Sequence, residues 1–206
     1  MTATELPAEA TRPPAVLTEM PSGRTVGWWG MVMFVATEAT VFAVLLSSYF
    51  YVRFQVGEWP PGGIEKAKLL KPLIMTAVLL PSSMPVIWAE RGIRKGQRWR
   101  LRLGLVATIL MGASFLTLQG FEYAEKLEKY TLTTNMYGSF FYTITGFHGL
   151  HVIIGLIMVS WLLAASIRGS FGYRHHERVR LAAIYWHFVD VVWAFILFTI
   201  YLSDHL

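Results

Sequence analysis

The sequence contains no cysteine, and this absence removes several classes of site at once. Disulfides, thiolate zinc sites, iron–sulfur clusters and thiolate copper sites are all excluded. Charged residues are scarce, at 15%, whereas a soluble globular chain has about a quarter. Residues 1–26 carry no apolar run, so they do not predict a cleavable signal peptide. What the chain has instead is 54% hydrophobic residues and a mean hydropathy of +0.46, which indicates a membrane protein.

Five mostly apolar stretches are each long enough, at about 20 residues, to cross about 30 Å of hydrocarbon as a helix. They leave only short connections between them, so no soluble domain fits. We therefore predict an all-α integral membrane protein with a flexible cytoplasmic tail over 1–26 and a bundle of five transmembrane helices over 27–206. The expected spans are 27–52, 72–89, 101–121, 137–167 and 181–202.

The basic residues are unevenly placed along the chain, whose net charge is +5. Of the 18 lysines and arginines, two fall in the tail, six in the second connection and four in the fourth. Cytoplasmic loops carry such an excess, so the pattern predicts a cytoplasmic N-terminus and a C-terminus outside. Because orientation accounts for the positive charge, it does not indicate a nucleic-acid partner.

The second span contains Pro81 and Pro85, each of which removes a backbone donor from a helix. This spacing predicts a kink around Ser82 and Ser83, with their hydroxyls available to the freed carbonyl oxygens. A transport site built on a broken helix would need a matching break in another half of the chain. The sequence has no internal repeat, which favours a simple kink.

Ionisable residues inside the predicted spans carry the functional question, because an intramembrane charge is expensive. They are Glu38, His148, His151, His187 and Asp190. The two histidines of the fourth span are spaced i, i+3, as are the histidine and aspartate of the fifth, so each pair shares a helix face. At 1.5 Å per residue all of them lie between the midplane and the cytoplasmic face. We predict one buried polar layer joining the first, fourth and fifth helices.

These residues allow more than one role. A metal or haem site at His148 and His151 is one alternative. No second histidine pair lies at matched depth, and this favours hydrogen bonds between helices. Asp190 is expected to pair with His187 or His148, because a partner lowers the cost of a buried carboxylate. The helical neighbours of Glu38 are apolar, which leaves open a proton relay, a lipid headgroup contact and a structural hydrogen bond.

Several runs of residues together resemble subunit III of the haem-copper respiratory oxidases, in order, over about residues 27–206. The two longest run from Gly146 to Gly155 (GFHGLHVIIG) and from Tyr185 to Trp193 (YWHFVDVVW). The others are Trp29-Gly30-Met31 with Glu38 and Phe42, Trp59-Pro60-Pro61, Gln119 with Glu122 and Tyr123 at the outer end of the third span, and Tyr137-Gly138-Ser139-Phe140-Phe141.

The resemblance implies an accessory subunit that binds neither haem nor copper and has no catalytic residues of its own. Its partners would be the catalytic subunit I, which houses haem and copper, subunit II and further small subunits. In the family, the acidic residue matching Glu38 reacts with hydrophobic carbodiimides, and tightly held phospholipid lies near it and near the histidines matching His148 and His151. The family role is to protect the oxidase during turnover and to keep proton uptake fast.

Longer family members have seven helices and hold lipid in a cleft between the first two and the other five. A complete cleft here would need its second wall from a partner subunit. The five-helix length and the lack of a targeting sequence favour a bacterial plasma membrane.

Other functions stay open at this stage. One is subunit III of a quinol oxidase, and another is an autonomous proton-coupled transporter that uses Glu38 and Asp190. A third is a membrane cytochrome with its own haem. Three features look more like the cytochrome c branch: the Trp59-Pro60-Pro61 run, Glu38, and the full run from Phe147 to Gly155. We therefore expect an accessory subunit of a proton-pumping cytochrome c oxidase.

Overall fold

The structure, a computed structural model, describes residues 24–57, 59–61, 68–169 and 176–205. Most of the predicted tail, together with Arg174 and His175, lies outside the described residues. Within the described part every regular element is helical. Five helical segments are long and apolar enough to cross a membrane, which confirms the predicted number. They are Val26–Gln55, Leu70–Arg94, Arg98–Leu127, Met136–Ile167 and His176–Leu202.

Four of these segments extend beyond the predicted apolar spans by several residues, and two of the helices begin at a side-chain cap. The first segment is α1, Val26–Gln55, and the Thr25 side chain accepts a hydrogen bond from the Trp28 amide at its start. Asn135 caps α5, Met136–Ile167, by accepting from the Gly138 amide at 2.8 Å. The third segment is α4, Arg98–Leu127.

The second segment is interrupted where the prolines predict a kink. It consists of α2, Leu70–Leu79, a 3-10 turn over Leu80–Ser82, and α3, Ser83–Arg94. The serine hydroxyls were expected to serve the freed carbonyls, and this expectation is wrong. Both point to the fifth segment instead: Ser82 accepts from the Trp186 indole at 2.8 Å, and Ser83 contacts His187 and Asp190.

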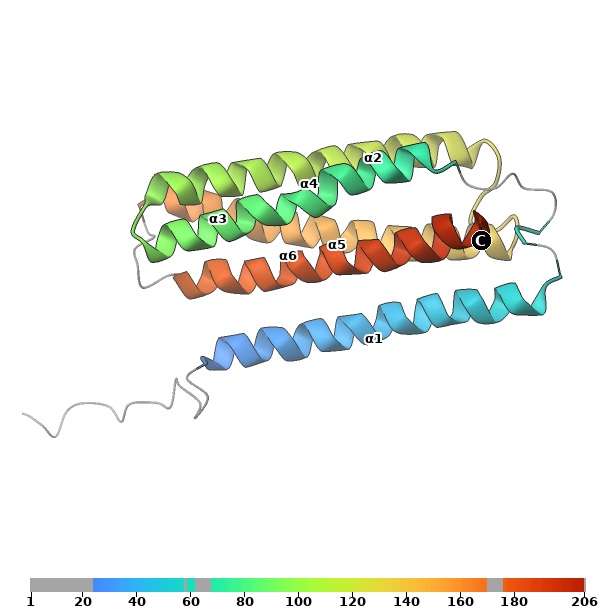
Figure 1. Cartoon of the computed structure of the whole chain (residues 1–206), viewed down its shortest axis with the longest axis horizontal. Coiled ribbons are helices and arrows are strands. Elements are labelled where there is room, and N and C mark those ends of the chain that lie inside the picture. Colours follow the sequence, from blue (N-terminus) through green and yellow to red (C-terminus); the bar gives the residue numbers. More distant parts are fainter. Residues whose placement is uncertain (1–23, 58, 62–67, 170–175, 206) are drawn as a thin grey trace, which may run out of the picture.

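The fifth segment lies at the centre of the bundle (Figure 1). It comprises α6, His176–Ile196, and a π-helical turn over Leu197–Leu202. The α6 helix packs against α1, α3 and α5, while α4 packs against α2, α3 and α5. In the fifth segment 61% of the apolar span is buried, against only 6% in α1, which lies at the edge of the bundle.

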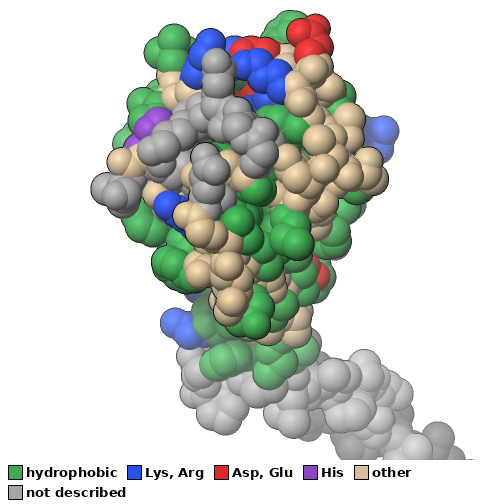
Figure 2. Space-filling view, turned by 90° about the vertical axis from the view of Figure 1, so that its right-hand side faces the viewer, with side chains coloured by type: hydrophobic (Ala, Val, Ile, Leu, Met, Phe, Trp, Pro, Cys, Tyr) green, Lys and Arg blue, Asp and Glu red, His purple; other side chains and the backbone are tan. Residues whose placement is uncertain are grey.

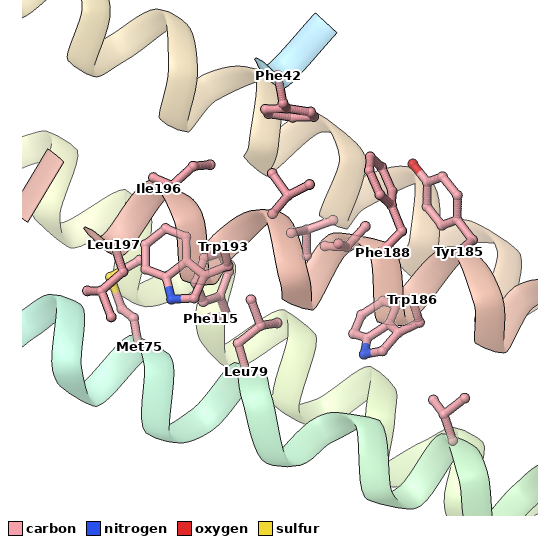
Figure 3. Close-up of a cluster of buried hydrophobic side chains, with 14 of the residues drawn as sticks. Phe42, Met75, Leu79, Phe115, Tyr185, Trp186, Phe188, Trp193, Ile196 and Leu197 are labelled. Atoms are coloured by element: carbon pink, nitrogen blue, oxygen red, sulfur yellow. The ribbon is translucent and has the colours of Figure 1, made fainter. Parts of the chain in front are cut away.

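Large aromatic side chains of α6 fill the core (Figure 3). Trp186 and Trp193 are fully buried, and the Trp193 ring meets Phe115 of α4 edge to face at 4.7 Å. The Trp193 indole donates to the Thr76 hydroxyl of α2 at 2.9 Å. With no water in hydrocarbon, each buried indole N–H needs such a partner, so these bonds fix the α2–α3 segment against α6.

Polar contacts fasten α1 to the rest of the bundle at both of its ends. Near the start, the Thr25 hydroxyl donates to Glu177 of α6. At the other end, Arg53 donates to the carbonyl oxygen of Ser203 at 2.6 Å. Because α1 buries little of its own surface, these contacts are a large part of what positions it.

Figure 2 views the end of the bundle where α1 ends and α2 begins, and basic and acidic side chains lie next to one another along one edge. At the start of α2, Lys71 forms an ion pair with Glu125 of α4. Below this edge, hydrophobic side chains form much of the surface that is seen in this view.

Candidate functional site

Glu38 and His151 meet across the gap between α1 and α5. The Glu38 carboxylate lies 3.1 Å from the Nε2 atom of His151, and the Nδ1 atom of that histidine lies 2.7 Å from the Phe147 carbonyl oxygen. A carbonyl oxygen only accepts, so Nδ1 carries a proton and Nε2 faces the carboxylate. A hydrogen bond there requires one proton, held by either the carboxyl or the imidazole. The pair is therefore a neutral unit that shares one exchangeable proton.

The two members of this pair differ in exposure. The His151 side chain is 7% exposed and is enclosed by the rings of Phe42, Tyr185 and Phe188, whereas the Glu38 side chain is 26% exposed. Glu38 thus makes a hydrogen bond to another helix, which is one of the roles that the sequence left open. It is also the member of the pair that is reachable from outside the bundle.

His148, one turn away on α5, does not join this contact. Its ring is fully buried between Phe115 and Trp193, with centroid separations of 5.6 and 5.3 Å. Neither ring nitrogen has a hydrogen-bond partner among the described residues. Of the two partners expected for Asp190, His148 is therefore excluded, because it faces α4 and the α6 tryptophan.

A second polar cluster joins α3 to α6. The Ser83 hydroxyl lies 2.7 Å from Nδ1 of His187 and donates to Oδ2 of Asp190. A hydroxyl has one proton, so donation to the carboxylate makes His187 Nδ1–H the donor to Ser83. The result is a directed chain from imidazole to hydroxyl to carboxylate. The predicted polar layer joined the fifth span to the first and fourth, whereas this cluster joins it to the second segment.

The predicted single polar layer is consequently two separate contacts, Glu38 with His151 and Ser83 with His187 and Asp190. Sequence reasoning missed Ser83 as a partner. Its position between two prolines was the available signal, because a 3-10 turn redirects side chains relative to a continuous helix.

The outer-end motif of α4 forms a third cluster. Gln119 donates to the Thr145 carbonyl oxygen at 2.8 Å, and Tyr123 shares a 2.6 Å hydrogen bond with the Thr145 hydroxyl, so both side chains bind α5. Glu122 instead accepts from the Tyr201 hydroxyl at 3.0 Å and lies 3.6 Å from the Lys126 ammonium.

Lys126 and Tyr201 were not predicted, although both shape this cluster. The Lys126 ammonium lies 4.5 Å from the Phe141 ring centroid and 5.5 Å from that of Tyr201, and its side chain is only 14% exposed. A buried ammonium held by a carboxylate and aromatic faces satisfies its charge locally. A lysine one turn from Glu122 was the signal in the sequence.

The chemistry available in these clusters is proton binding and hydrogen bonding. The described residues include no group of three or more His, Cys, Asp or Glu side chains that could hold a metal ion. The fold and these contacts define a multi-pass helical membrane protein that keeps protonatable groups between its helices.

Comparison with known proteins identifies the family. The model of the cytochrome c oxidase subunit III family matches residues 22–204. "Cytochrome c oxidase subunit 3" of Coturnix japonica is 38% identical and that of Oncorhynchus mykiss 40% identical, each over 179 residues that cover 84% of this chain and 68% of the relative. The chain belongs to the cytochrome c oxidase subunit III family. It is an accessory subunit of a haem-copper terminal oxidase, as the resemblance predicted.

Proposed function

We propose that this chain sustains proton uptake and protects the catalytic subunit during turnover of a proton-pumping oxidase that takes electrons from cytochrome c. Haem and copper belong to the neighbouring subunit I, and subunit II and smaller subunits complete the complex. The chain lies in a bacterial plasma membrane with its N-terminus in the cytoplasm. It contributes no residue to oxygen reduction and supports the subunit that performs it.

The observation that carries this proposal is the proton shared by Glu38 and His151. The pair lies within the membrane span, one member is accessible from outside the bundle, and neither proton position leaves a net charge. Movement of the proton between the two groups keeps the pair neutral, and Glu38 is the member exposed for exchange with the surroundings. The pair is suited to passing protons beside an enzyme that consumes them.

Glu38→Ala tests the role during turnover. We expect the initial oxygen-reduction rate of the assembled complex to stay close to that of wild type, and its activity to decay several-fold faster during continuous turnover. Glu38→Gln is the matched control, because it keeps the size and a hydrogen-bonding group while removing the exchangeable carboxyl proton. It should decay as Glu38→Ala does. Wild-type longevity for Glu38→Gln would leave a structural role only, and immediate loss of activity would assign Glu38 to the main proton route.

Purification of the tagged chain from its native membrane tests the assignment to the complex. We expect haem absorption bands in the purified material and oxidation of reduced cytochrome c by it. Oxidation of a quinol in place of cytochrome c would assign the quinol oxidase branch. Transport activity by the chain alone would support the transporter, and a haem band from the chain expressed alone would support a membrane cytochrome.

A further inference from the structure

A groove lies between α3 and α4, near the short connection that joins them. The two helices lie side by side up to that connection (Figure 1). The volume of the groove is about 620 Å³, and most of its lining is apolar, from Met84, Ile87, Trp88, Leu103 and Ala107. Met84, Trp88 and Leu103 are exposed on the outside of the bundle, so the groove opens toward the membrane.

Arg91 alone is charged among the residues that line this groove, and it lies at the end nearest the connection. Along α3 the distance from Met84 to Arg91 is about 10 Å, at 1.5 Å per residue. Trp88 lies one turn from Arg91 toward the middle of the span, at the depth where tryptophan marks a membrane interface. The groove therefore joins an apolar part within the hydrocarbon to a cation at the level of lipid headgroups.

An aromatic cluster fixes the wall of the groove beside Arg91. The rings of Trp88 and Trp99 meet edge to face, with their centroids 5.4 Å apart. The Arg100 guanidinium lies 5.9 Å from the Trp88 centroid and 5.4 Å from that of Trp99. Gly92 makes room for this arrangement, since an added Cβ atom would lie 2.6 Å from the Arg100 Cβ. Arg100 thus places a second guanidinium beside Trp88.

The positive charge at this end of the groove is not neutralised within the chain. Residues 84–107 contain six lysines and arginines and a single acid, Glu90, which pairs with Arg94 at 2.6 Å. Neither Arg91 nor Arg100 forms an ion pair with an acidic residue of the part that the structure describes. A guanidinium matches the geometry of a phosphate, so both side chains are available to a phosphate group.

We propose that the groove between α3 and α4 binds one anionic phospholipid, with its phosphate on Arg91 and an acyl chain along Met84, Ile87 and Leu103. Basic pockets between membrane helices bind anionic headgroups in this way. A free phosphate ion would leave the apolar part unused, and a zwitterionic lipid would bring an ammonium group against the arginines. No residue of α1 or α5 lines this groove, so the site is separate from the phospholipid that the family resemblance places near Glu38.

Photo-crosslinking with identification of the lipid headgroup tests this site. The chain is purified with its native partners and reconstituted in vesicles made of equal parts of phosphatidylglycerol and phosphatidylethanolamine. A benzophenone amino acid replaces Leu103, which lines the groove and is 55% exposed, or Leu110, which is 63% exposed on α4 outside it. We expect the ratio of phosphatidylglycerol to phosphatidylethanolamine adducts to be about fivefold higher at Leu103, the preference that one basic residue gives an anionic lipid.

Two substitutions show whether the groove or the general basic charge selects the lipid. Arg91→Gln should remove the enrichment at Leu103. Arg94→Gln is the matched control, because it removes the same charge from an arginine that pairs with Glu90 and does not line the groove. Equal ratios at Leu103 and Leu110, enrichment that survives Arg91→Gln, or adducts with protein alone at Leu103 would each overturn the proposal.

Lipid retention provides a second measurement, in chains that carry no probe in the groove. Arg91 is exposed and forms no ion pair with an acidic residue of the described part, so Arg91→Gln leaves the helix packing intact. After the purified material is washed in detergent, wild type and Arg94→Gln should retain more phosphatidylglycerol per chain than Arg91→Gln. Equal retention by the two variants would overturn the site.

Discussion

At the scale of single residues, the same side-chain types do different work according to what faces them. His151 shares a proton with Glu38, His187 donates through Ser83, and His148 is enclosed by aromatic rings. All three lie on helices at similar depth, so depth alone does not distinguish them. The direction in which each side chain leaves its helix assigns its role.

Two glutamates of α4 test how burial changes the contribution of an ion pair to stability. Glu122 is 5% exposed and holds Lys126 and Tyr201, whereas Glu125 is 43% exposed and pairs with Lys71. Glu122→Ala leaves a buried ammonium without its carboxylate, and we expect it to lower the free energy of unfolding by about 3–5 kcal/mol. Glu125→Ala is the control and should change it little, because exposed ion pairs contribute little.

Denaturant titration of each variant in detergent, followed by far-ultraviolet circular dichroism, measures this difference. Equal effects of the two substitutions would show that the outer cluster does not depend on burial. Glu122→Gln should fall between them, since it keeps an acceptor for Tyr201 while removing the charge.

At the scale of helices, packing depends on positions where no side chain fits. Gly104 of α4 faces α3, and an added Cβ atom would lie 2.5 Å from the Pro85 carbonyl oxygen. Gly155 of α5 similarly faces the Trp186 ring of α6, with an added Cβ 2.9 Å away. Such glycines allow the close approach that membrane helices use in place of a hydrophobic driving force.

Gly104→Ala is therefore expected to destabilise the bundle by about 1–3 kcal/mol, because the obstructing atom belongs to the backbone and cannot turn aside. Gly120→Ala, on the same helix, is the control, since an added Cβ there meets nothing within 4 Å. It should be neutral or stabilising by up to about 1 kcal/mol, because alanine favours the helix. Thermal unfolding of both variants in detergent measures the contrast, and a stable Gly104→Ala chain would contradict the α3–α4 contact.

At the scale of the whole molecule, the peripheral position of α1 stands out. It buries 6% of its apolar span and relies on Thr25, Glu38 and Arg53 for its contacts with the bundle. Loss of one contact should therefore loosen α1 more than loss of a comparable contact would loosen α6, which is held by packing on three sides.

Orientation is a second property of the whole molecule. The connection between α3 and α4 is flanked by Arg91, Arg94, Lys95, Arg98, Arg100 and Arg102. The positive-inside rule predicts that it is cytoplasmic. A reporter enzyme that works only in the cytoplasm should therefore be active when it is fused near Gln97. Exposure of that reporter on the outer face would reverse the whole orientation, including the N-terminus.

Much of this protein could be predicted from its sequence. Hydropathy determined the five spans, because the length of hydrocarbon to be crossed is fixed, and the proline pair located the 3-10 turn. The ordered runs around His148, His151 and Asp190 were sufficient to indicate the family. These features depend on composition and order along the chain.

Only the tertiary structure decided which polar groups meet. Spacing along a helix gives depth and a shared face, but it does not give the rotation of that helix or the identity of its neighbour. Those depend on how large side chains such as Trp186 and Trp193 pack against small residues and serines on other helices. That packing turned Asp190 toward Ser83 and left its second carboxylate oxygen buried, without a hydrogen-bond partner among the described residues, which no pattern in the sequence indicated.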